Sequence, residues 1–87
     1  MTKFQGAVIK EQGVKFAVVV VKRHVIQAQH EARKVMGDFG QIFPGIPIVL
    51  MAQDGRGVPT YLGRPDIAKF MSRVPLGAIP WKEYTIS

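Results

Sequence analysis

Four basic or titratable side chains stand at the ends of two apolar stretches of the chain. Lys22, Arg23 and His24 close the first stretch, and Arg56 follows the second. If the two stretches form parallel strands, their carboxyl ends share one edge of a sheet, where open α/β sheets bind ligands. The helix expected after His24 has no Ser, Thr, Asp or Asn cap, so its free N–H groups add to the attraction for an anion. These four residues are therefore candidates for an anion-binding basic rim, and the simpler alternative is that they are solvated charges at strand ends.

Two aromatic residues near the end of the chain are candidate contacts for a partner. Trp81 and Tyr84 could anchor a partner protein or stack on a base. The alternative is that a final strand packs both against the sheet. Their spacing places them on opposite faces of such a strand.

No residue pattern indicates catalysis, a metal or a cofactor. The chain has no cysteine, which excludes thiolate nucleophiles, iron–sulfur clusters and thiolate zinc sites. His24 and His30 are six positions apart, about 120° around a helix, and cannot bind one metal as an i, i+4 pair can. The carboxylates are scattered along the sequence, at Glu11, Glu31, Asp38, Asp54, Asp66 and Glu83. We therefore expect no catalytic residues, no metal and no cofactor.

Length and composition predict a single domain over residues 1–87. The chain is 47% hydrophobic and 21% charged, and its net charge of +6 favours anionic partners. No apolar run approaches the roughly 20 residues that cross a bilayer, so no membrane association is expected. No signal peptide is visible at the start, which makes the cytoplasm the expected location.

The hydrophobic pattern predicts strands and helices in a regular order. Gly13 marks a hairpin turn, Gly37 and Gly40 are expected to end the first helix, and Pro59 indicates an edge strand. Strands are predicted at residues 4–10, 14–22, 46–52, 58–63 and 79–86, and helices at 24–39 and from Arg64 to a stop at Pro75.

This order predicts an α+β fold, a two-layer ββαββ(α) sandwich with two helices and a mixed sheet of four to five strands. The second and third strands form a right-handed parallel crossover around the first helix. The two hairpins place the first and fourth strands outside this central pair, as edge strands. Because the central strands are apolar on both faces and two helices readily cover only one, a second copy of the chain or a partner is expected on the open face.

Residues 39–73 resemble the C-terminal half of thioredoxin-fold proteins. Gly45-Ile46-Pro47 opens an apolar strand, a glycine turn and a second strand follow, and a helix comes after Gly63. The resemblance covers under half of the chain and implies a cis bond between Ile46 and Pro47. The redox Cys-x-x-Cys of that family is missing, so no thiol chemistry is implied.

The sequence favours a small non-enzymatic binding or adaptor domain that acts as a homodimer through protein contacts. One alternative is nucleic-acid or phosphate binding through the basic rim. A weaker alternative is a small-molecule-binding protein or an enzyme, for which a deep pocket is the minimum requirement.

Overall fold

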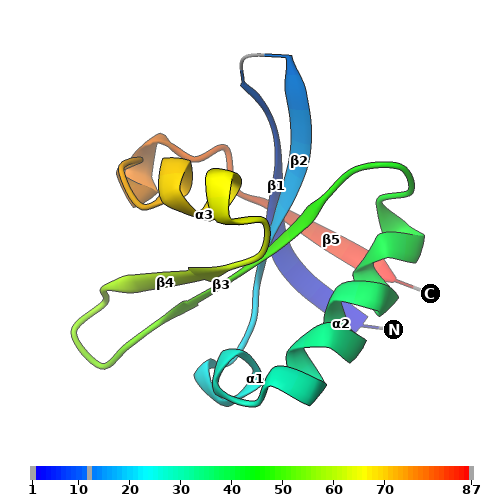
Figure 1. The fold of residues 1–87 in the computed structure, drawn as a ribbon, viewed down its shortest axis with the longest axis horizontal. Coiled ribbons are helices and arrows are strands. Elements are labelled where there is room, and N and C mark those ends of the chain that lie inside the picture. Colours follow the sequence, from blue (N-terminus) through cyan, green and yellow to red (C-terminus); the bar gives the residue numbers. More distant parts are fainter. Residues whose placement is uncertain (1, 12, 87) are drawn as a thin grey trace.

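The computed structural model describes residues 2–11 and 13–86, in which five strands form one mixed sheet (Figure 1). The strand order across the sheet is β4-β3-β2-β1-β5. In chain order the elements are β1 (Thr2–Glu11), β2 (Val14–Val20), α1 (Arg23–Gln27), α2 (Gln29–Ile42), β3 (Ile48–Gln53), β4 (Pro59–Leu62), α3 (Pro65–Met71), the 3-10 helix η1 (Leu76–Ala78) and β5 (Lys82–Ile86).

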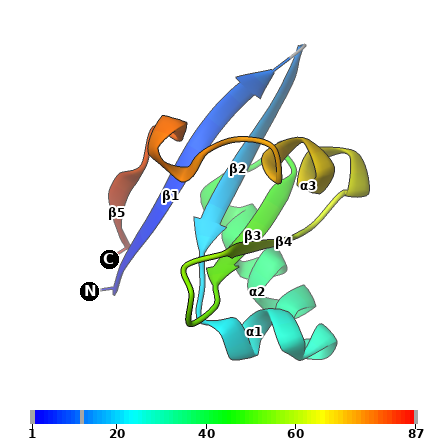
Figure 2. The ribbon, with the colours of Figure 1, turned by 90° about the vertical axis from the view of Figure 1, so that its left-hand side faces the viewer.

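The centre of the sheet is the parallel pair β2 and β3. Their register runs from Ala17 opposite Ile48 to Val20 opposite Met51, which confirms the predicted parallel crossover. β1 precedes this pair in an antiparallel hairpin that extends beyond the helices (Figure 2). Gly13 has a φ of 80°, which glycine adopts without strain, while Gln12 of the same turn lies outside the described residues.

The two edges of the sheet are formed by β4 and β5. Pro59 begins β4, as expected for an edge, because proline has no N–H to donate to a neighbouring strand. The expectation that β1 is also an edge is wrong, since β5 pairs with it from Thr2↔Ile86 to Gly6↔Lys82. The aromatic side chains of Phe4 and Tyr84 stack across this pairing and hold the tail against the sheet.

Buried side chains gather in two clusters, one on each face of the sheet. β2 contributes to both because its side chains alternate between faces: Phe16 and Val18 to one cluster, Ala17 and Val19 to the other. The first cluster contains Ile67 and Met71 of α3, and the second contains Val25 of α1 and Ala32 of α2. The strands accordingly pass between α3 and α2 (Figure 1).

The α+β class and the mixed sheet are confirmed. The number of helices and the faces that they cover differ from the prediction. Three α-helices are present in the described residues instead of two, and they divide between the two faces. The apolar face that sequence reasoning expected to remain open is therefore covered by helices of the same chain.

The predicted helix over 24–39 is two helices, and it ends later than expected. Ala28 separates them with an extended backbone (φ −104°, ψ 99°), and α2 continues through Gly37 and Gly40 to Ile42. The apolar stripe continues on both sides of Ala28, so its period does not signal the break. Phe39 and Ile42 pack on the second cluster. This burial offsets the roughly 1 kcal/mol that each glycine costs in a helix.

The three C-terminal strands are shorter than their apolar runs suggest. β3 begins at Ile48, and the bond between Ile46 and Pro47 is trans, because the described residues contain no cis peptide bond. The cis proline implied by the thioredoxin resemblance is therefore wrong. Before β5, the chain forms η1 and passes Pro80, which cannot donate to a strand ladder.

Candidate functional site

The parallel strands bring the basic rim to one end of the sheet. Lys22 and Arg23 follow β2 at the start of α1, and Arg56 lies in the turn between β3 and β4. Both segments lie at the same end of the molecule (Figures 1 and 2). The side chains of these three residues and of His24 are exposed. The structure thus places the four predicted residues along one edge.

The turn that carries Arg56 is held by three hydrogen bonds that involve side chains. The Asp54 carboxylate accepts from the backbone N–H of Arg56 at 2.8 Å and of Val58 at 3.0 Å. The Gln53 side-chain amide donates to the carbonyl of Gly57 at 3.0 Å, and Gly57 has a φ of 82°. Arg56 is therefore presented from a preorganised backbone, which lowers the entropy lost on binding.

Electrostatics inside the rim are mixed in sign. The N–H groups of Val58 and Arg56, helped by the positive charge of Arg23, lower the pKa of Asp54 below its ordinary value of 3.8. His24 lies 3.7 Å from Glu31, measured from Nε2 to Oε1. Lys22, Arg23 and Arg56 form no salt bridge with another described residue within 4.0 Å, and the attraction between Arg23 and Asp54 acts over a longer distance.

The two aromatic candidates contact opposite faces of the domain. Trp81 packs on the first cluster, and its indole N–H donates to the carbonyl of Leu76 at 3.1 Å. Tyr84 packs on the second cluster and stacks on Phe4. Each remains partly exposed, and their role in contacting a partner stays a prediction.

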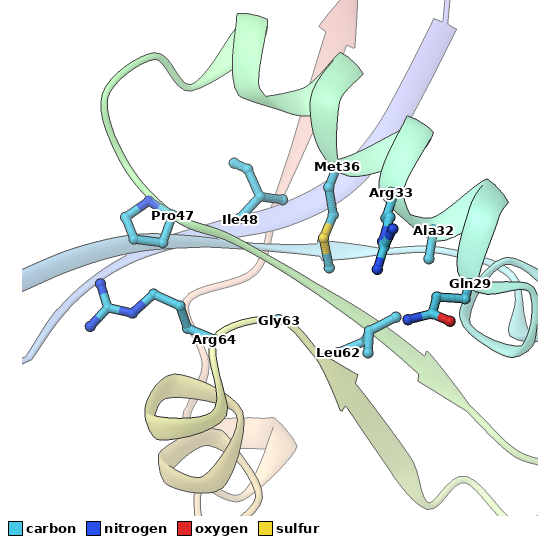
Figure 3. A pocket seen from close by; sticks show the side chains of 9 residues that line it. All are labelled: Gln29, Ala32, Arg33, Met36, Pro47, Ile48, Leu62, Gly63 and Arg64. Carbon is cyan, nitrogen blue, oxygen red and sulfur yellow. The ribbon is translucent and has the colours of Figure 1, made fainter.

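A cavity of about 540 Å³ lies between α2 and the strand edge formed by β3 and β4 (Figure 3). We call it the α2–β4 groove. From α2, Arg33 and Met36 point into it, and Leu62 faces them from β4. Its lining consists of Gln29, Ala32, Arg33, Met36, Pro47, Ile48, Leu62, Gly63 and Arg64.

Sequence reasoning did not identify the α2–β4 groove. Its only local signal is that Gln29 and Arg33, at i and i+4, share the flank of the helix that also carries Ala32 and Met36. The groove itself arises because α2 packs on β3, whereas β4 is contacted by α3 on the other face. No sequence pattern within one helix or strand predicts that the two helices pack on different strands and on opposite faces of the sheet.

Neither a cluster of metal ligands nor a membrane-spanning helix is found in the described part of the chain. Residues 2–11 and 13–86 contain no group of three or more His, Asp or Glu side chains placed to hold a metal. Among these same residues, no helix is both long enough and apolar enough to cross a membrane. Comparison with protein-family models, curated proteins and solved structures found no match.

Proposed function

We propose that this chain is a non-enzymatic binding domain that contacts the phosphate backbone of nucleic acid through its basic rim. The observation that carries this proposal is the common edge at which Lys22, Arg23 and Arg56 lie exposed, with no salt bridge within 4.0 Å to another described residue. The net charge of +6 adds long-range attraction for a polyanion.

The fixed turn around Arg56 supports this choice of surface. The Asp54 carboxylate accepts hydrogen bonds from backbone N–H groups, so this acidic residue stabilises the turn. Gly55 and Gly57 flank Arg56 without side chains, which leaves room for a bulky backbone to approach. The rim can therefore meet a phosphate chain along the β3–β4 turn and the start of α1.

The sequence also predicts a homodimer. Its motivation was an open apolar face, and each face now carries helices of the chain. Val58, at 54% exposure, is the one large hydrophobic side chain that is exposed within residues 2–11 and 13–86. Dimerisation stays a prediction, which light scattering at the concentration of the binding assays will decide.

Fluorescence anisotropy with a labelled single-stranded oligonucleotide tests the proposal across a series of salt concentrations. Each phosphate neutralised on a single strand contributes about −0.7 to the slope of log K against log salt, so three rim cations predict a slope near −2. Arg56→Ala should weaken binding and reduce the magnitude of the slope by about 0.7.

Lys69→Ala is the matched control, because Lys69 is an exposed cation on α3, away from the rim. It removes the same charge and should change the slope far less than Arg56→Ala. Undetectable binding at low salt would refute the proposal. An equal effect of the two variants would refute the rim as the contact surface, because net charge alone would then explain the binding.

A further inference from the structure

The α2–β4 groove has the walls of a small-molecule site. Ala32 and Met36 of α2 face Ile48 and Leu62 across it, and all four belong to or pack on the second buried cluster. Gly63 adds no side chain to the lining. A volume of about 540 Å³ falls within the range of 300–1,000 Å³ typical of pockets for small ligands.

Its polar side chains are few: two arginines, Arg33 and Arg64, and the neutral amide of Gln29. Arg33 extends from α2 into the cavity between Ala32 and Met36 (Figure 3). It forms no salt bridge with any residue in 2–11 or 13–86. Arg64, at the other end, is already occupied: its Nη2 donates to Asp66 Oδ2 at 2.7 Å and its Nε to Oδ1 at 3.2 Å.

The groove thus offers one uncommitted guanidinium set in an apolar surface. A guanidinium binds a carboxylate with two parallel hydrogen bonds, and because Arg33 is exposed the ion pair is worth only a modest gain in affinity. The complementary ligand has an apolar body that covers Met36 and Leu62 and a single anionic group that reaches Arg33.

We infer that the α2–β4 groove binds a small amphipathic carboxylate, with its apolar part between α2 and β4 and its carboxylate on Arg33. The lining spans only about two turns of α2 and the ends of two strands, which is a compact site for one small ligand. The site shares no residue with the basic rim, so this inference does not depend on the nucleic-acid proposal.

Octanoate and octan-1-ol form a matched pair of probes, with the same apolar chain and different charge. Titration of each into ¹⁵N-labelled protein, followed by ¹H–¹⁵N chemical shifts, gives both the affinity and the location of binding. We expect shifts centred on Met36, Leu62 and Gly63 for both probes. Octanoate should bind more tightly by about three- to tenfold, which is the value of a partly exposed ion pair or a charged hydrogen bond.

Arg33→Gln should remove this preference for octanoate while leaving the affinity for octan-1-ol within about twofold. Lys34→Gln is its control, because Lys34 is the next residue on α2, is exposed and does not line the groove. Met36→Trp fills the cavity and should weaken both probes. The amide spectrum of each variant reports whether the fold is retained.

Three results would overturn the inference. The first is a set of octanoate shifts that lie away from the groove. The second is equal affinity of the unsubstituted protein for the two probes. The third is an equal loss of octanoate binding in Arg33→Gln and Lys34→Gln, which would make the effect one of net charge alone.

Discussion

Tyr84 stacks on Phe4 across the β1–β5 pairing, with ring centroids 5.1 Å apart and ring planes 11° apart. Phe43, which follows α2, meets the edge of Tyr84 at 5.3 Å, and Phe39 of α2 meets Phe4 at 4.8 Å. The four rings connect the last strand, the first strand and the end of α2. The C-terminal tail is therefore part of the core on this face.

Tyr84→Ala should lower the free energy of unfolding by about 2 kcal/mol, because it removes apolar burial and an aromatic stack from a half-buried site. Tyr84→Phe keeps the ring and should change it by less than about 0.5 kcal/mol. Thr85→Ala, at the next and exposed position of β5, is the control. Urea unfolding measures all three, and a Tyr84→Ala protein as stable as the control would show that the tail does not contribute to the core.

Trp81→Phe tests the hydrogen bond from the indole N–H to the carbonyl of Leu76, which is 3.1 Å long and partly buried. Its loss should cost about 1 kcal/mol, with much of the packing on the first cluster kept. Chemical denaturation gives the value. A loss near zero would mean that water replaces the bond without penalty.

Glycine substitutions at two positions should have opposite effects on stability. A Cβ at Gly6 would lie 2.9 Å from the carbonyl oxygen of Val18, so Gly6→Ala should destabilise the protein by about 1–3 kcal/mol. A Cβ at Gly37 meets nothing within 4 Å, and Gly37→Ala should stabilise α2 by about 0.5–1 kcal/mol. Melting temperatures of the two variants should move in opposite directions, and a shift of the same sign in both would contradict this assignment.

Asp54 should make the β3–β4 turn sensitive to acid. Its pKa is lowered in the folded protein, chiefly by the N–H groups of Val58 and Arg56, so folding favours the carboxylate over the protonated form. The stabilisation is complete above its ordinary pKa of 3.8 and is lost as the pH falls through the lower folded-state pKa. The pKa of Asp66 is also lowered, because its carboxylate accepts hydrogen bonds from the Arg64 side chain.

Carboxyl ¹³C chemical shifts recorded against pH measure this directly. Asp54 should titrate below its ordinary value of 3.8, and the amide signals of Arg56 and Val58 should follow the same curve. In Asp54→Ala the turn loses its acceptor, and the stability difference from the unsubstituted protein should shrink toward acid pH. An Asp54 that titrates at its ordinary value would contradict the hydrogen bonds of the turn.

Local patterns in the sequence predict most of the sheet. The apolar, β-branched run that ends at Val21 predicts a central strand, Gly13 predicts the first turn, and Pro59 predicts an edge. The position of the basic rim can then be predicted, because a parallel crossover brings the carboxyl ends of β2 and β3 to the same edge of the sheet. Each of these inferences depends on backbone preferences within a few residues or on the handedness of the crossover.

Other features depend on packing between distant residues. α2 runs past Gly37 to Ile42 because Phe39 and Ile42 find a buried surface, which the local preference of glycine does not anticipate. β1 is an interior strand because the tail returns to pair with it.

The sequence by itself determined the class of fold, the central parallel pair and the shared edge of the basic rim. Tertiary structure alone decided which face each helix covers and which strand α2 leaves bare, and so where the α2–β4 groove lies. The physical reason is that backbone preferences act over a few residues, whereas the placement of a helix on a sheet depends on the summed packing of side chains far apart in the chain.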